Sequence, residues 1–404
     1  MVGPYRELFS APGTKGFVVA GFVGRMPMSM LGIGIVLLIS ALTGSYATAG
    51  AISATVAIAF AVAAPLSGRL VDRFGQARVL MPLVLLHGAA LVTLMLCTAF
   101  GAPMWTLFVS AVVVGGAATS LGSMVRARWS HILGRSSRLH TAFSFESVAD
   151  EVIFVAGPAL VTGLTTMVNL YAGLILALVA TVVGTVAFSL QRATEPPVRP
   201  DIAQSGTPIM IPGVALLSCV FLAMGAVFGS VDLITVAFAE DRGVKAASGL
   251  LLGAFAGGSM VSGLWYGFRH WRISLRQRFM RGLAVFAAGL TPILLIGDVK
   301  VMAIGLFFAG LAISPTIITG YALIERLVPG HLLTEGMSWI STAVGFGVAI
   351  GAWAGGRLTD SFGASNAYAF SIASALLAVV IGIGGNTWLR TPETGHSEAP
   401  SPAA

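Results

Sequence analysis

The chain has 404 residues, of which only 10% are charged and 56% are hydrophobic, and its net charge is +7. Soluble domains carry about 25% charged and about 45–50% apolar residues. A soluble fold of this length could not bury so much apolar surface, because exposed area still rises steeply with mass. The composition therefore excludes a soluble globular protein, a disordered chain and a collagen, and indicates a protein that lives in a lipid bilayer.

Hydropathy divides the chain into apolar segments of about 20 residues, the length that an α-helix needs to cross a bilayer. Twelve are predicted, at 17–42, 48–67, 79–99, 103–125, 141–164, 168–190, 212–237, 248–268, 280–297, 301–324, 336–355 and 366–388. An alternative count merges or drops the short ninth segment, but charged segments on both sides of it argue against that. The fold class is therefore an all-α membrane protein with twelve transmembrane helices.

Basic residues are distributed unequally between the loops. Loops after even-numbered spans contain fifteen arginines, including Arg126 and Arg128 after the fourth span. Loops after odd-numbered spans contain only Arg242, Lys245, Lys300 and Arg357. Because cytoplasmic loops carry the excess of Lys and Arg, the first set of loops and both termini are predicted to be cytoplasmic. The positive charge thus reflects topology, and no nucleic-acid partner is expected.

A polar, proline-rich stretch at 191–211 interrupts the spans and is interpreted as a cytoplasmic linker. It separates an N-terminal six-helix bundle, residues 1–190, from a C-terminal six-helix bundle, residues 212–390. The segment 391–404 is rich in Pro, Glu, Ser and Ala and is predicted to be a disordered cytoplasmic tail.

A short motif occurs twice. Gly68–Gly75 reads G-R-L-V-D-R-F-G, and Gly356–Gly363 reads G-R-L-T-D-S-F-G, so six of eight positions are identical. The predicted topology places Asp72 inside and Asp360 outside. Inverted three-helix repeats, which are common in transporters, require this arrangement.

The segment G-R-L-V-D-R-F-G-Q-A-R-V-L, residues 68–80, resembles the signature between spans two and three of the major facilitator superfamily. That pattern is Gly, any, Leu, any, Asp, Arg, any, Gly and then a basic cluster. With the span count, the linker and the repeat, the resemblance covers nearly the whole chain. It implies two pseudo-symmetric six-helix bundles around a cavity lined mainly by spans one, four, seven and ten, and transport by alternating access.

The resemblance also implies roles for the motif. Asp72 would help to hold the two halves together in the outward-facing state. Gly68 allows two helix ends to approach closely, and Gly75 permits a tight turn. Arg73 and Arg78, with Asp72, can form ion pairs or meet helix ends.

The chain departs from the family pattern at Gln76 and Ala77, where basic residues are frequent in the family. The contact by which Asp72 would hold the halves together is therefore expected to be weaker than in the family, or other residues supply the positive charge of this loop. The structural alternative is an ordinary cytoplasmic hairpin whose arginines only determine topology.

Five ionisable side chains fall within predicted spans: Arg25, Glu146, Asp150, Glu151 and Asp232. A charged residue at a helix centre costs roughly 2.5–3.5 kcal/mol on insertion scales, so such residues are functional candidates by default.

Depth indicates which of these charges meet. Arg25 and Asp150 each lie about nine residues, or roughly 13 Å, beyond their predicted cytoplasmic helix starts. We therefore predict that Arg25 pairs with Asp150 or Glu151. Three acids in span five against one base leave a surplus carboxyl group, and an unpartnered carboxyl in low dielectric can carry a proton near neutral pH. Proton coupling is the functional reading, and a static ion pair that orders the bundle is the alternative.

Two stripes are candidates for a solute cavity. Phe221, Gly225, Phe228 and Asp232 follow one face of span seven, and an aromatic stripe that ends in a carboxylate could bind an amphipathic or cationic solute. The alternative is a packing stripe with Asp232 near the outer water. Span ten presents a second stripe that includes Ser314 and Tyr321, and Pro315 predicts a kink there.

Gly157 and Pro158 in span five resemble the centre of the antiporter signature of exporters in the same superfamily, and mark a candidate hinge. Only this centre matches, because Val161 and Thr162 occupy the places of the paired glycines. Span four is also predicted to lack the buried arginine often found in such exporters. Both departures argue against drug export specifically.

No sequence motif for an enzyme is present: there is no D-D-x-x-D, H-E-x-x-H, nucleophile elbow or P-loop. We therefore expect no enzymatic activity, no cofactor and no metal site, and energy from an ion gradient. The favoured prediction is a monomeric exporter in a bacterial cell membrane, which exchanges protons for a small organic compound. Proton-coupled uptake is the second alternative, and a non-transporting membrane receptor is the third.

Overall fold

The computed structural model describes residues 7–43, 46–134, 136–198, 206–244, 247–269, 271 and 273–390. The predicted tail, 391–404, and part of the predicted linker lie outside these residues. The first half contains α2 (Thr14–Arg25), α3 (Pro27–Thr43), α4 (Tyr46–Phe74), α5 (Gln76–Ala99), α6 (Met104–Ala117), α7 (Leu121–Leu133), α8 (Ser137–Met167) and α9 (Ala172–Leu190). The second half contains α10 (Pro212–Asp241), α11 (Ser248–Phe268), α12 (Leu275–Leu290), α13 (Val299–Gly310), α14 (Ile313–Leu327), α15 (Leu333–Phe362) and α16 (Ala364–Gly384).

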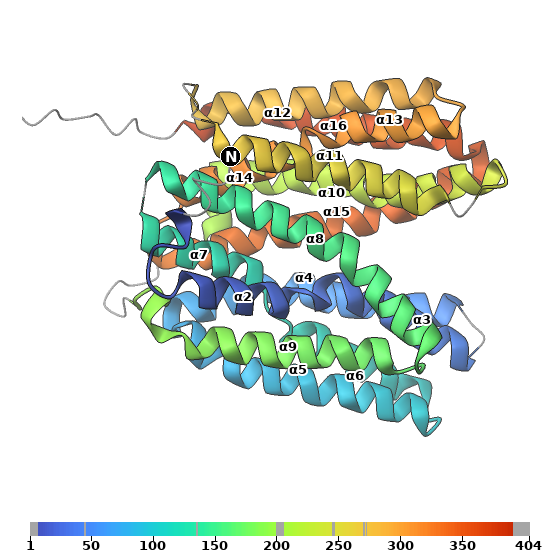
Figure 1. The fold of residues 1–404 in the computed structure, drawn as a ribbon, viewed down its shortest axis with the longest axis horizontal. Coiled ribbons are helices and arrows are strands. Elements are labelled where there is room, and N and C mark those ends of the chain that lie inside the picture. The colour runs from blue at the N-terminus through green and yellow to red at the C-terminus, as the bar shows by residue number, and fades with distance from the viewer. Residues whose placement is uncertain are drawn as a thin grey trace, which may run out of the picture.

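The prediction of twelve spans is confirmed: the described residues contain twelve helical segments long and apolar enough to cross a membrane. Spans one, four and ten each consist of two consecutive helices, α2 with α3, α6 with α7, and α13 with α14. The helices run roughly parallel in two bundles, with the first half below the second in Figure 1.

Three predicted span ends are too early by about two helical turns. The second span continues from the predicted residue 67 to Phe74, the fourth from 125 to Leu133, and the eleventh from 355 to Phe362. As a result, Arg126 and Arg128 belong to α7 and are buried, and do not lie in a loop. A prediction from hydropathy ends a span at its first charged residue. A charged residue that has a partner inside the protein can nevertheless remain in the transmembrane helix.

Proline explains one of the helix breaks. The tenth span is interrupted at Leu311 and Ala312, one turn before Pro315. Proline has no N–H to donate to the carbonyl four residues earlier, here that of Leu311. The predicted kink is therefore present, but it lies on the N-terminal side of Pro315, which itself sits in the first turn of α14.

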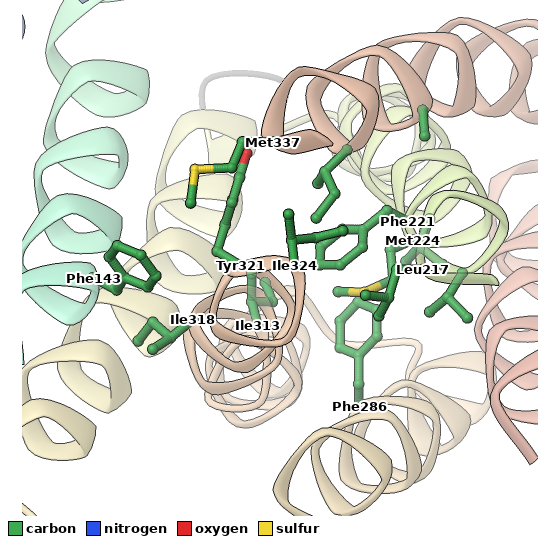
Figure 2. Close-up of a cluster of buried hydrophobic side chains, with 14 of the residues drawn as sticks. Phe143, Leu217, Phe221, Met224, Phe286, Ile313, Ile318, Tyr321, Ile324 and Met337 are labelled. Carbon is green, nitrogen blue, oxygen red and sulfur yellow. The ribbon is translucent and has the colours of Figure 1, made fainter. Parts of the chain in front are cut away.

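The halves meet where span two packs against span eleven and where span five packs against spans eight and ten. α4 packs against α15, and α8 packs against α11 and α14. Figure 2 shows the second contact, where Phe143 of α8 lies opposite Ile318 of α14, beside the buried aromatic and aliphatic core of the second half. The charged groups of α8 are thereby brought to the boundary between the halves.

Within the second half, α10 and α15 pack closely through paired glycines. A Cβ atom added at Gly225 or Gly229 would lie 2.3 or 2.0 Å from a backbone oxygen of α15. One added at Gly347 or Gly351 would lie 2.1 Å from a backbone oxygen of α10. Small residues four apart on both helices allow this close approach, which stabilises helix pairs where no hydrophobic effect drives association.

The glycine contact predicts a stability difference along α15. Gly351→Val should lower the Tm of the purified protein, because its side chain would overlap the α10 backbone. Gly345→Ala should leave the Tm nearly unchanged, because no atom lies within 4 Å of its added Cβ. Equal Tm values for the two variants would contradict this packing arrangement.

Candidate functional site

Four charged side chains form a buried cluster in the first half. Arg25 Nη2 lies 2.5 Å from Glu146 Oε2, and Arg25 Nη1 lies 2.7 Å from Asp150 Oδ1. Arg126 Nη2 lies 2.8 Å from Asp150 Oδ2. Two guanidinium groups therefore face two carboxylates, and the cluster is electrically balanced. Asp150 is one of the two partners of Arg25 that the sequence predicts.

Neighbouring groups hold the cluster in place. The Trp129 indole N–H donates to Glu146 Oε1 at 2.7 Å, and Arg25 Nε donates to the Gly21 carbonyl at 3.1 Å. Glu146 is fully buried, while the side chain of Asp150 is 22% exposed. Removing one member would leave an uncompensated buried charge, which is far more costly than losing one hydrogen bond.

Arg126 is the member that the sequence analysis missed, and the expectation that span four has no buried arginine is wrong. A signal was present, since no Gly or Pro occurs between Gly122 and Gly134 to end the helix before this residue. Arg126 also reaches the second half: its guanidinium carbon lies 4.2 Å from the ring centroid of Tyr321. Its Nε is buried and has no hydrogen-bond partner.

Hydroxyl groups surround this contact between the halves. Tyr321 Oη lies 3.3 Å from Ser341 Oγ, and the Ser120 hydroxyl donates to the same Ser341 oxygen at 3.4 Å. A cation, an aromatic ring and hydroxyl groups from both halves therefore converge at one place.

Glu151 lies outside the charged cluster. Its carboxylate Oε1 accepts a hydrogen bond of 2.5 Å from the Ser259 hydroxyl of α11, and Ser259 Oγ lies 3.0 Å from Ser314 Oγ. Arg25 therefore does not pair with Glu151, the other partner that the sequence allowed. Among the described side chains no salt bridge involves Glu151, so it is the surplus acid of α8.

Asp72 joins the halves at their predicted cytoplasmic end. Its carboxylate accepts hydrogen bonds from the backbone N–H groups of Thr334 and Glu335, at 3.2 and 2.9 Å, in the first turn of α15. A helix N-terminus offers free N–H donors and a positive dipole end, so it binds a carboxylate well. Gly68 allows the approach, since a Cβ there would lie 2.9 Å from the Glu335 Cα.

Arg69 of the motif adds an ion pair to this contact, with its Nε 3.9 Å from Glu335 Oε2, whereas Arg73 and Arg78 take no part in it. Arg73 and Arg78 are exposed, and Arg73 lies over the ring of its neighbour Phe74 at 5.2 Å. Gly75 forms the turn with φ +89, and its counterpart Gly363 has φ +79. Asp360, the counterpart of Asp72, is exposed at the opposite end of α15. The repeated motif is thus engaged at one end of the molecule in this structure.

Further bonds join the halves on the same side as Asp72. His140 Nε2 lies 2.9 Å from the Tyr266 carbonyl oxygen, and Thr141 donates to the Gly267 carbonyl at 3.1 Å. Deeper in the bundle, the Thr342 hydroxyl donates to the Ala61 carbonyl at 3.0 Å. We call this set of contacts, with those of Asp72 and Glu151, the inner seam.

The side chains of the predicted stripe on span seven have different surroundings in the structure. Phe221 is fully buried against Phe279 and Tyr321, with ring centroids 6.2 and 6.5 Å away, and so does not line an open space here. Phe228 is half-buried beside Phe286. Asp232 is exposed.

The candidate hinge in span five lies within a continuous helix. α8 runs unbroken through Gly157 and Pro158. A Cβ at Gly157 would lie 1.9 Å from the Ser29 hydroxyl oxygen of α3, and Ser29 donates a 2.8 Å hydrogen bond to the Ile153 carbonyl. Gly157 therefore serves close packing between α8 and α3 in this structure.

The described residues contain no group of three or more His, Cys, Asp and Glu side chains arranged to hold a metal ion. The chemistry available at the site is that of ion pairs, hydroxyl groups and one surplus carboxyl group.

Comparison with known families agrees with this architecture. The model of the Major Facilitator Superfamily matches residues 17–299 and 249–403. The chain therefore belongs to this superfamily of membrane transporters, as the motif in residues 68–80 suggested. A comparison with curated proteins finds no match.

Solved structures show the same fold at low sequence identity. A bacterial homologue of the iron transporter ferroportin, in an outward-facing state, has 18% identity and a TM-score of 0.73, with 93% of this chain and 99% of that chain covered. The human organic anion transporter MFSD10 has 14% identity and a TM-score of 0.72, with 92% and 100% covered. FucP in its outward conformation has 12% identity and a TM-score of 0.72, with 93% and 98% covered.

The balance of the charged cluster predicts a compensating pair of variants. Arg126→Gln should lower the Tm strongly, by an amount equivalent to roughly 3–5 kcal/mol, because one carboxylate loses its cation. Adding Asp150→Asn should restore most of the loss, because Arg25 and Glu146 then balance each other. A double variant no more stable than Arg126→Gln would contradict the charge-balance argument.

The contact of Asp72 predicts a change in conformation. In a chain without Cys97 and Cys219, Ser338→Cys would report on the inner seam, where Ser338 is fully buried near Gly68. Asp72→Asn should increase the alkylation rate of this cysteine about fivefold, as expected for loss of a helix cap worth about 1 kcal/mol. Asp360→Asn removes the same charge at the exposed counterpart and should leave the rate unchanged. Equal rates in both variants would show that Asp72 does not hold the seam closed.

Proposed function

We propose that this chain is a proton-coupled exporter of a small organic compound, and that Glu151 is the group that carries the proton. The observation that supports this most directly is the position of Glu151. It is an acid without a cation in the transmembrane region, and it is bonded to Ser259 of the opposite half. A carboxyl group in such a setting is suited to exchange protons near neutral pH.

The charged cluster supports the same assignment by elimination. Arg25 and Arg126 balance Glu146 and Asp150, so a proton on either of these acids would leave a buried cation in excess. A proton on Glu151 carries no such penalty. Glu151 is also partly exposed, whereas Glu146 is fully buried.

Protonation of Glu151 would act on the inner seam. A hydroxyl group donates a stronger hydrogen bond to a charged carboxylate than to a neutral carboxyl group. Proton uptake therefore weakens the link between α8 and α11 and favours separation of the halves on the predicted cytoplasmic side. Release of the proton to the cytoplasm would restore the link, so each cycle moves one proton inward while a solute can leave.

The contact between Arg126 and Tyr321 is our proposed site for the solute, with Ser314, Phe228 and Asp232 of the second half as further candidates. A cation, an aromatic ring and hydroxyl groups suit an amphipathic compound. The unpartnered Nε of Arg126 could donate to an acceptor on the solute. Because structurally similar MFSD10 is an organic anion transporter, a substrate screen should include amphipathic anions as well as cations.

Proton-coupled uptake is the second candidate, since the same carboxyl group can couple movement in either direction, and FucP from E. coli is a fucose:proton symporter.

Solute accumulation in everted and right-side-out vesicles, with and without a pH gradient, distinguishes export from uptake. Gradient-driven accumulation in everted vesicles supports export. Accumulation only in right-side-out vesicles would contradict it, and binding without flux in either would favour a receptor. The proposed location is a bacterial cell membrane.

Glu151 and Asp150 predict different transport defects. Glu151→Gln should lose most of the flux driven by a pH gradient but keep exchange of labelled for unlabelled solute, because the halves can still move. Asp150→Asn should impair both, because it leaves a cation of the cluster unbalanced. Asp241→Asn, at the exposed end of α10, is the control and should leave both unchanged.

If Glu151→Gln and Asp150→Asn both leave proton-driven flux unchanged, the assignment of coupling to α8 is wrong. If Glu151→Gln abolishes exchange together with driven flux, Glu151 binds the solute or supports the fold and does not carry the proton.

A further inference from the structure

Aromatic and arginine side chains gather where α11 ends and α12 begins, on the predicted cytoplasmic side. The Arg269 guanidinium carbon lies 5.2 Å from the ring centroid of Trp265 and 5.3 Å from that of Trp271. Arg278 lies 5.9 Å from the centroid of Tyr266 and 5.8 Å from that of Trp271. We call these five residues the aromatic–arginine cluster.

Positive charge gathers in and around this cluster. Among the described side chains, no salt bridge reaches Arg269, Arg278 or Arg326. Arg326 of α14 adds like charge beside Arg278. Arg276 and Arg281 lie on α12 within one turn of Arg278 in sequence. Like charges held this close repel one another unless an anion lies between them.

Two buried polar atoms in the cluster make no hydrogen bond of normal geometry, although their side chains, Tyr266 and Arg278, interact with each other. Tyr266 is only 3% exposed, and its hydroxyl oxygen makes no hydrogen bond of normal geometry. The Nε of Arg278 is likewise buried and unpartnered. Buried polar groups are nearly always hydrogen-bonded, so each unpaired one calls for an explanation. A ligand with several acceptor oxygens would give both groups an acceptor of better geometry than they give each other.

We propose that the aromatic–arginine cluster binds the phosphate headgroup of an anionic phospholipid from the cytoplasmic leaflet. Arginine forks match the oxygens of a phosphate. Basic pockets between transmembrane helices on this side of a membrane are suited to anionic headgroups.

The surroundings favour a lipid over a soluble anion. Trp265 is 51% exposed and Leu264 is 39% exposed on the outer surface of α11. Indole rings prefer the level of the headgroups, and apolar side chains beside them can contact acyl chains. A lipid therefore gains apolar contacts that free phosphate does not.

The aromatic–arginine cluster lies next to the inner seam, so a lipid bound there would affect how the two halves meet. The carbonyl oxygen of Tyr266 accepts a hydrogen bond from Trp271 Nε1 at 3.4 Å, and His140 Nε2 of the first half lies 2.9 Å from the same oxygen. The headgroup would thus lie beside the inner seam. By fixing Tyr266, it stabilises the arrangement in which the halves touch on this side.

The test uses the full-length protein in nanodiscs of phosphatidylcholine alone or with phosphatidylglycerol. Native mass spectrometry should show phosphatidylglycerol, but not phosphatidylcholine, retained by the wild type. R269Q/R278Q should weaken retention by about tenfold or more, since each arginine near a membrane surface contributes about 1 kcal/mol. R138Q/R390Q removes the same charge from exposed positions outside the cluster and should retain the lipid.

Two further measurements distinguish loss of the lipid site from misfolding and from binding of phosphate alone. R269K/R278K preserves the charge and should fold if R269Q/R278Q does not, with retention reduced because lysine lacks the arginine fork. Inorganic phosphate alone should neither bind nor displace the lipid. Equal retention by R269Q/R278Q and R138Q/R390Q, equal retention of both lipids, or full displacement by inorganic phosphate would each overturn the proposal.

Discussion

Charge balance inside a low-dielectric interior is the constraint on which the rest of this structure depends. Two arginines from spans one and four are held among apolar helices only because two carboxylates of α8 face them. This pairing fixes where α2, α7 and α8 meet. Both arginines are thereby paired, and Glu151 is left as an acid whose hydrogen-bond partner lies in the other half.

In the inner seam, both backbone groups and side chains join the two halves. Asp72 binds the free N–H groups at the start of α15, so the contact needs no side-chain cation on the other half. The same motif is exposed around Asp360 at the far end of α15. A molecule with inverted repeats can thus engage one copy of a motif while the other is free, which fits a transporter that alternates between two arrangements.

Much of the fold could be predicted from the sequence, because a bilayer requires about 20 apolar residues per span and the motif in residues 68–80 marks the family. Matched depth along two helices was enough to bring Arg25 to Asp150. The role of Arg126 could not be seen in this way, because the same residue type also determines topology in loops. The link from Glu151 to Ser259 depends on how the halves pack, and hydropathy contains no information about partners across a boundary.

The central claim is that one surplus carboxyl group gains and loses a proton while the charged cluster stays ionised. Infrared difference spectra of the purified protein, recorded across a pH titration, test this most directly through the carbonyl band of a protonated carboxyl group. The account predicts that this band is lost in Glu151→Gln and is retained in Asp232→Asn. A band that persists in Glu151→Gln and disappears in Asp150→Asn would contradict it.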